Sequence, residues 1–241
     1  MIGSRIVIAA ITLLLTFSIL STHSRAQVEL VENGSFETGD FTGWTDDSTS
    51  EFGEWFVYSA SDMVTILPPP VGEYAAFTQQ ANESSMILYQ DIAVPPGAQV
   101  SCSVIVYLEN DAEGYMIGDG LIPDGENQQM RIDLMDPEAD PYDTGAGVLE
   151  NLFQTLPGDP NSIGYTTLDF DLTPYAGETV RFRAAVVVTE DVLNGSIDGF
   201  SCVTLEAASI PTLSEWGMIA AAAGLEIVGL FFAARRKRIS A

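Results

Sequence analysis

The hexapeptide Thr167-Leu168-Asp169-Phe170-Asp171-Leu172 alternates polar and apolar side chains, the pattern of a β-strand with one buried face. Two further stretches, 101–108 and 186–189, are rich in the β-branched residues that strands favour. Eight strand-like runs, each bounded by Gly, Pro, Asn or Asp, cover 54–58, 74–78, 85–94, 99–108, 129–134, 165–171, 179–188 and 196–205. No stretch of residues 27–208 keeps a helical period, so the sequence predicts an all-β sandwich or jelly roll.

The chain begins with the three parts of a secretory signal peptide. Arg5 supplies the positive charge, residues 6–20 form the apolar stretch, and Ser24-Arg25-Ala26 is a small-x-small cleavage site. We expect residues 1–26 to be removed and the mature protein to begin at Gln27.

The C-terminal segment 209–241 also has three parts in a fixed order. The motif Ile210-Pro211-Thr212-Leu213-Ser214-Glu215-Trp216-Gly217 precedes an apolar run, 218–234, and a basic tail, 235–238. At ~1.5 Å per residue the run spans roughly 25 Å, slightly short of a ~30 Å hydrocarbon core. The basic tail is typical of a cytoplasmic stop. Glu226 opposes membrane insertion, since an ionisable group near the middle of a span costs ~2.5–3.5 kcal/mol.

This order resembles the C-terminal sorting signal of bacterial exosortase substrates, in the variant that carries Ile-Pro-Thr-Leu. The resemblance implies an inner-membrane-anchored precursor that is cut near residues 210–217 by an exosortase-like membrane transpeptidase. The product would then be attached to the cell surface or released. The alternative is an ordinary transmembrane helix that anchors the protein and is never cut.

The body left between these two ends has an unusual set of ionisable groups. It contains no His and no Lys, and its basic residues are Arg131, Arg181 and Arg183. This composition excludes a Ser-His-Asp triad, a His-based zinc site and a Schiff-base lysine, but it permits a pair of catalytic carboxylates. Three arginines against 32 acids give a formal charge of −29, which excludes nucleic acid as a partner. The acids form either a solvated surface or, for a few of them, a Ca²⁺ site.

Five segments in order resemble galactose-binding-like jelly rolls, a fold that includes many carbohydrate-binding modules. They are Asn33-Gly-Ser-Phe-Glu-Thr-Gly39 with Gly43-Trp44, then residues 72–77, 88–97 and 172–182, and last Ile197-Asp-Gly-Phe-Ser-Cys-Val203. The resemblance runs from about residue 28 to 206. It implies a single galactose-binding-like jelly-roll β-sandwich over residues 27–208.

The same resemblance implies a structural Ca²⁺ near the meeting of the first and last strands. Its carboxylate ligands would be Glu37 and Asp198, with backbone carbonyls near Ser35 and Glu73. Oxygen ligands suit this hard cation. The alternative is that both carboxylates are turn residues that accept hydrogen bonds from local amides. Gly199 stands where a further acid or amide is common, so one ligand is missing.

Cys102 and Cys202 are the only cysteines, and both lie in predicted strands. An even number of cysteines in an exported body indicates a disulfide, and two buried thiols are the alternative.

Sugar binding requires exposed aromatic rings with polar neighbours. Trp44, Trp55 and Tyr58 are candidates, but both tryptophans lie in settings more typical of a core. Tyr115 and Tyr142 lie in the acidic, turn-rich stretch 109–150, which we expect to be a solvated connection, and they are the preferred sugar-binding residues.

Taken together, these features predict a non-enzymatic, surface-destined β-sandwich that serves in adhesion or the extracellular matrix, with a surface or matrix polysaccharide as its partner. The alternatives are a carboxylate-based glycoside hydrolase and a purely structural surface protein.

Overall fold

The computed structural model describes residues 27–48, 53–62, 67–205 and Leu225. The described part of residues 27–205 contains ten strands and one short 3₁₀ helix. They are β1 (Thr45–Ser48), β2 (Phe56–Ser59), β3 (Tyr74–Gln80), β4 (Ser84–Ala93), β5 (Gln99–Asn110), β6 (Gln129–Met135), β7 (Val148–Gln154), β8 (Ser162–Asp171), η1 (Thr173–Tyr175), β9 (Thr179–Val188) and β10 (Leu193–Leu205). The all-β prediction is therefore confirmed for this part of the chain.

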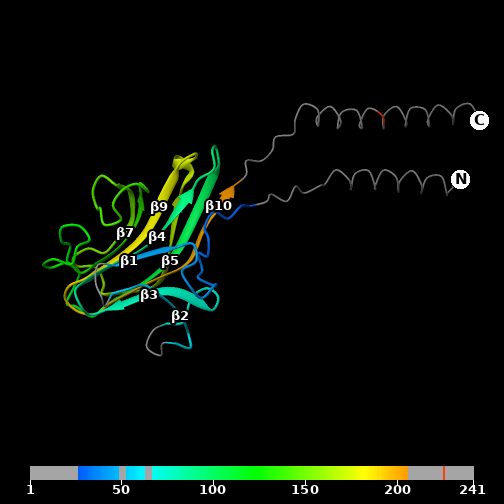
Figure 1. Cartoon of the computed structure of the whole chain (residues 1–241). Helices are drawn as coiled ribbons and strands as arrows, with labels where there is room; N and C mark the ends of the chain where they lie inside the picture. Colours follow the sequence, from blue (N-terminus) through cyan, green and yellow to red (C-terminus); the bar gives the residue numbers. More distant parts are fainter. Residues whose placement is uncertain (1–26, 49–52, 63–66, 206–224, 226–241) are drawn as a thin grey trace, which may run out of the picture. The chain divides into compact units, whose positions relative to one another are not determined.

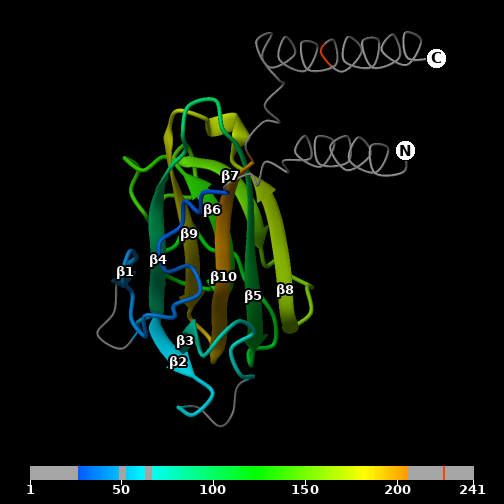
Figure 2. The same cartoon turned by 90° about the vertical axis from the view of Figure 1, so that its right-hand side faces the viewer.

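The strands form two five-stranded antiparallel sheets that face each other (Figure 1). Sheet I has the order β1-β4-β9-β6-β7, and sheet II has the order β2-β3-β10-β5-β8. From β3 onward the chain changes sheet at every connection except that between β6 and β7, which is the winding of a jelly roll. The long strands β4, β5, β9 and β10 run along the whole sandwich (Figure 2).

The core lies between the sheets and is built by alternate residues of these long strands. Val180, Phe182, Ala184, Val186 and Val188 of β9 all belong to it. Their intervening neighbours project from the outer face of sheet I, because successive side chains of a strand point to opposite faces. The alternation read from the sequence therefore predicts which face of each long strand is buried.

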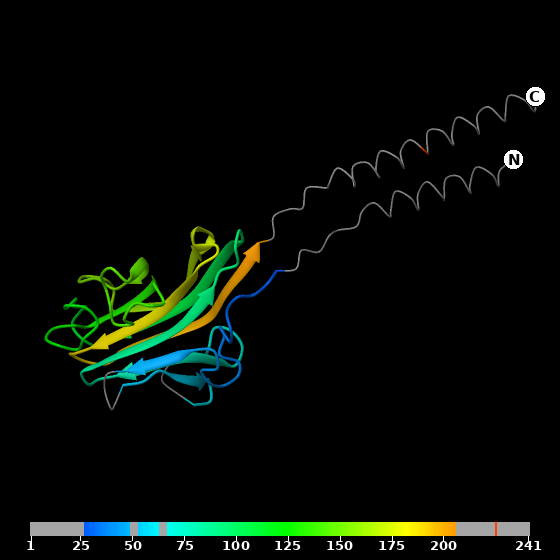
Figure 3. The ribbon, with the colours of Figure 1, turned by 45° about the horizontal axis from the view of Figure 1, so that its top comes forward.

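Both ends of the described body lie at one pole of the sandwich, beside the end of β10 (Figure 3). Leu30 N donates to Cys202 O at 2.9 Å, and Thr204 N donates to Val28 O at 3.0 Å. A disulfide joins Cys102 of β5 to Cys202 of β10, which are directly paired across the two strands. The first and last segments of the body are thus closed onto each other.

The acidic stretch 109–150 is not the solvated connection that we expected. It supplies the end of β5, all of β6 and the start of β7, and its intervening loops fold over the outer face of sheet I. Leu121 is fully buried there against Ile87, Ala185 and Val187. The many acidic side chains of these loops indicated a solvated segment, although the inner surface of the loops packs on sheet I through residues such as Leu121.

Arg183 holds one of these loops in place. It is fully buried, and its Nη1 donates to the backbone carbonyls of Pro141 and Asp143, the latter at 2.7 Å. Its Nη2 pairs with Asp133, which is also bound by Arg131 at 2.7 Å. Burial lowers the pKa of Arg183, while the charge of Asp133 opposes this shift. Arg183 therefore acts as an internal anchor of this loop.

The chain divides into two units, 1–205 and 206–241. The expected signal peptide, the motif 210–217, the basic tail and, apart from Leu225, the apolar run 218–234 lie outside the described residues. Among the residues that are described, no helix is both long and apolar enough to cross a membrane.

Candidate functional site

The loop before β1 is held in an unusual backbone conformation. Asn33 and Phe36 have positive φ angles of 51° and 55°, which for a bulky residue such as Phe is rare. The Asn33 side chain donates to Asp40 O at 2.9 Å, and its backbone carbonyl accepts from Trp44 Nε1 at 3.2 Å. Phe36 is fully buried. Burial and hydrogen bonds together stabilise a strained loop, a feature that recurs at functional sites.

This loop delivers Glu37 to the segment that enters β3. Glu37 Oε1 accepts hydrogen bonds from the backbone N–H groups of Glu73 at 2.9 Å and Tyr74 at 3.0 Å. Gly72 has a φ of +67°, and a Cβ added there would collide with the Glu37 carboxylate. The positive φ favours glycine at position 72, and an added Cβ would displace the Glu37 carboxylate from its hydrogen bonds to Glu73 and Tyr74.

Asp198 binds the same segment from the outer face of sheet II. Its Oδ2 accepts from Val71 N at 3.0 Å, and its Oδ1 accepts from Gly199 N at 2.6 Å. Asp198 is fully buried, and this burial raises the pKa of its carboxyl to about 7, although the two amide hydrogen bonds partly oppose the rise. A bulge in β10 follows at Gly199, where φ is +56°.

The structure thus brings Glu37, Asp198 and Glu73 to one short segment, residues 71–74. The hydrogen bonds present are those of the alternative interpretation, in which both carboxylates accept from local amides. No hydrogen bond ties Ser35 to this segment within the described part of the chain. Nor do the described residues form a group of three or more Asp, Glu, His or Cys side chains suited to a metal. A cation here would rely on two carboxylates and on backbone or water oxygens.

A bound cation would nevertheless stabilise the ionised form of the buried Asp198 carboxyl. A buried carboxylate is costly unless it is paired, and the arginines of the body project from the other sheet, where they hold Asp133, Asp91 and loop carbonyls. A raised carboxyl pKa is also the property of a catalytic general acid. Asp198 has no exposed surface, however, and both of its oxygens are already bound, so the geometry does not offer it to a substrate.

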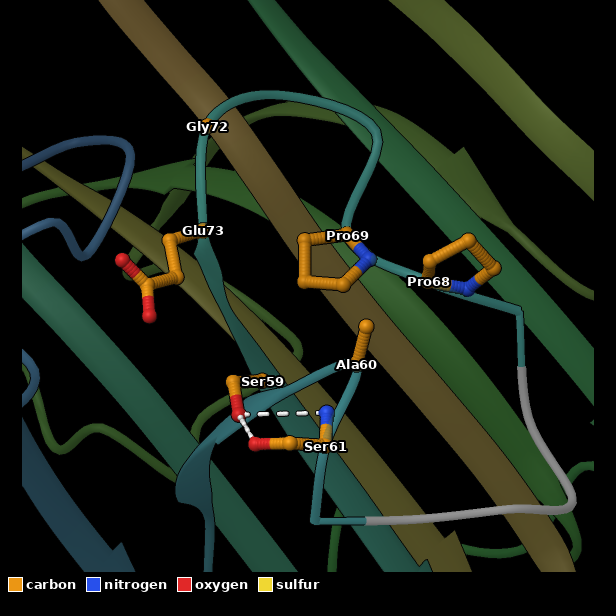
Figure 4. Close-up of a pocket in the computed structure, with 7 residues that line it drawn as sticks. All are labelled: Ser59, Ala60, Ser61, Pro68, Pro69, Gly72 and Glu73. Atoms are coloured by element: carbon orange, nitrogen blue, oxygen red, sulfur yellow. Dashed lines mark hydrogen bonds between the residues drawn. The ribbon is translucent and has the colours of Figure 1, made fainter.

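A cavity of about 340 Å³ lies beside this junction (Figure 4). It is lined by the turn after β2 and by the segment before β3, namely Ser59, Ala60, Ser61, Pro68, Pro69, Gly72 and Glu73. Ser59 Oγ and Ser61 Oγ are 2.7 Å apart, and Ser59 Oγ also donates to Asp62 Oδ2 at 2.7 Å. The serine hydroxyls therefore bind one another and the turn, and Glu73 is the carboxylate that lines the cavity.

A second cavity, of about 560 Å³, lies at the opposite pole from the chain ends. Five carboxylates line it, from Asp111, Glu113, Glu126, Glu190 and Asp191. Asp119 and Asp124, which cluster with Glu126 in the sequence, are not among its lining residues.

Neither preferred tyrosine is an exposed loop residue. Tyr115 is only 2% exposed and belongs to the main core, so its ring offers no free face to a sugar. Tyr142 is half-buried against Ile87 and its neighbours on sheet I, and its hydroxyl donates to Asp47 Oδ1 at 3.3 Å. Trp44 and Trp55 are core residues, as their sequence settings indicated.

Comparisons with known proteins found solved structures of similar fold but low sequence identity. No protein-family model matches the chain, and no curated protein matches it. Among solved structures, TmCBM61 in complex with β-1,4-galactotriose is 14% identical over 74% of this chain and 99% of its own, with a TM-score of 0.47.

Two further structures are similarly distant. The K1 cleaved adhesin domain of Lys-gingipain from Porphyromonas gingivalis W83 is 10% identical over 76% of this chain and 100% of its own, with a TM-score of 0.47. A cyclase from Fischerella sp. TAU is 15% identical over the same shares of the two chains, with a TM-score of 0.46. With TM-scores below 0.5, these likenesses carry no argument about what the chain binds or does.

Proposed function

We propose that the chain is an exported, non-enzymatic β-sandwich that is anchored to or released from the cell surface and serves in adhesion or glycan binding. The observation that carries this proposal is the closure of the body at one pole. Residues 28–30 pair with residues 202–204, and the disulfide lies in the same strand end. A domain whose two chain ends lie at one pole can be attached to a surface at that pole and leave the rest of the sandwich free. The disulfide is consistent with export, because disulfides persist in oxidising compartments.

The processing step follows from the sequence of the C-terminal segment. An exosortase-like membrane transpeptidase recognises residues 210–217 and cuts there, after the apolar run 218–234 has held the precursor in the inner membrane. Residues 1–26 direct export and are removed.

A structural Ca²⁺ at the junction of Glu37 and Asp198 forms part of the proposal. Asp198 would supply its buried carboxylate, Glu37 its second carboxylate, and Ser35 and Glu73 their carbonyls. The buried carboxyl of Asp198 pairs with no described arginine and its pKa is raised, which supports a cation, since metal binding requires the ionised form and stabilises it. The bound ion would join the loop before β1 to the last strand.

Export of the full-length chain, compared with a variant that ends at residue 209, tests the localisation. Cell fractionation is expected to find the full-length product at the surface and the truncated product in the medium. If both products remain in the same fraction, the C-terminal segment is not a sorting signal, and the proposal is wrong.

A further inference from the structure

The first described residue of the body is a glutamine that lies just outside the paired chain ends. Gln27 is exposed, and it makes no hydrogen bond with another described residue. The proposed removal of residues 1–26 would make it the first residue of the mature chain, with a free α-amino group. A glutamine in that position holds an amine and a side-chain amide carbon that can close a five-membered ring.

The pairing of the N-terminal segment with β10 begins at the next residue. Val28 N donates to Thr204 Oγ1 at 3.2 Å, and Val28 O accepts from Thr204 N at 3.0 Å. Leu30 N donates to Cys202 O at 2.9 Å. Because none of these bonds involves residue 27, a chemical change at the amine of Gln27 leaves the closure of the sandwich intact.

The segment that follows Gln27 is exposed but binds the last strand. Val28 is 52% exposed, and the exposed Glu29 accepts from Cys202 N through Oε1 at 2.8 Å. Val31, two residues further on, packs in the main core. Exposed chain ends are where proteolysis concentrates. An aminopeptidase that removed these residues one at a time would open the pole, so a blocked first residue would protect it.

The α-amino group of the mature chain would also be its single amine, because residues 27–217 contain no lysine. Near neutral pH a part of such α-amino groups is unprotonated and therefore nucleophilic. Conversion to an amide removes the terminal charge. The mature body would then carry the guanidinium groups of its three arginines as its cations.

We propose that Gln27 is a modification site, where the mature N-terminus cyclises to pyroglutamate and so blocks the chain end. This inference rests on the removal of residues 1–26 proposed above. The α-amino nitrogen attacks Cδ of its own side chain, and a bond forms between these two atoms. The bond between Cδ and Nε2 breaks, the amine gives up a proton, and Nε2 leaves as ammonia. The reaction therefore needs no oxidant, reductant or second substrate.

Peptide mass spectrometry tests the site on the product of the full-length chain, recovered after export from the cells that encode it. The protein is treated with an amine-reactive label before digestion. We expect an N-terminal peptide that begins at residue 27, lacks the label and is lighter than its sequence by one ammonia. These three properties together identify pyroglutamate at that position.

Gln27→Asn is the matched control. It keeps the polar amide, but its side chain is shorter by one methylene, so the same attack would close a strained four-membered ring. The variant should begin at the same residue and carry the label. Once unfolded in urea, it should lose that residue to an aminopeptidase, while wild type keeps its own. If the aminopeptidase also shortens wild type, the chain end is not blocked, and the proposal is wrong.

Two outcomes separate this inference from the proposed function. If the exported wild type begins at Gln27 with a labelled amine, the modification is absent, and the removal of residues 1–26 stands. If the exported protein begins at another residue, both the modification site and the proposed removal of residues 1–26 are wrong.

Discussion

Replacing Asp198 by Asn in calcium-free protein should remove a specific dependence of stability on pH. Asp198 is fully buried, and its pKa is raised to about 7 from an ordinary value of 3.8. Between these two values the folded protein holds a proton that the unfolded chain has released. The free energy of unfolding must therefore fall as the pH rises from about 4 through 7.

The size of this effect follows from the difference between the two pKa values. It corresponds to roughly 4 kcal/mol for one fully buried group, to be read as an upper bound. Asp46 also has a pKa raised, by burial, to about 6, but its side chain is largely exposed, so solvent screens its contribution. Asn at position 198 has no charge to lose, so the comparison of the two proteins isolates the Asp198 contribution.

The assay is urea unfolding at pH 5 and pH 8 in a chelator. Wild type should lose on the order of 2–4 kcal/mol more than Asp198→Asn over this interval. At pH 8, Ca²⁺ at 100 times its dissociation constant should return about 2.7 kcal/mol to wild type and nothing to the variant. If both proteins lose the same stability between pH 5 and pH 8, the reasoning about Asp198 is wrong. If Ca²⁺ leaves wild type unchanged, the cation proposal fails while the pH argument stands.

Two further changes test the packing of the body. Replacing both Cys102 and Cys202 by Ala opens a covalent loop with a sequence separation of 100 and should lower the unfolding free energy by up to ~4.7 kcal/mol, measured with denaturant; a loss under about 1 kcal/mol would contradict this. Gly72→Ala should destabilise the protein by about 1–3 kcal/mol more than Gly97→Ala. Both glycines have a φ near +70°, but an added Cβ meets Glu37 at position 72 and nothing within 4 Å at position 97. Equal melting temperatures for these two variants would show that the Glu37 contact is unimportant.

The sandwich could be predicted from sequence because its long strands bury one face and therefore alternate. The run 179–188 coincides with β9, and the other seven runs agree with their strands to within a few residues. The sequence pattern does not indicate two of the strands, β1 and β7, each for a different reason. β1 reads Thr-Asp-Asp-Ser and lies at the edge of sheet I, so no apolar face marks it. β7 begins at the end of the acidic stretch 109–150, whose turn residues indicate a connection.

The site was harder to predict because its residues meet through pairing between distant strands. Glu37 and Asp198 could be named from motifs, but their shared segment, 71–74, appears only when β3 and β10 are adjacent. Tyr115 lies among turn residues, and only tertiary packing places its ring in the core. Arg181 and Arg183 do carry a signal in the sequence, since two cations spaced by two in an apolar strand must share one face. The same alternation in 101–109 places Tyr107 and Glu109 together on the outer face of sheet II.

The intact mass of the mature protein, recovered from the surface of the cells that encode it, tests the central claim most directly. Our account predicts a polypeptide that begins at Gln27, contains the oxidised pair of cysteines and ends within residues 210–217. A surface protein that still carries the basic residues 235–238 would show an uncut anchor and contradict the account.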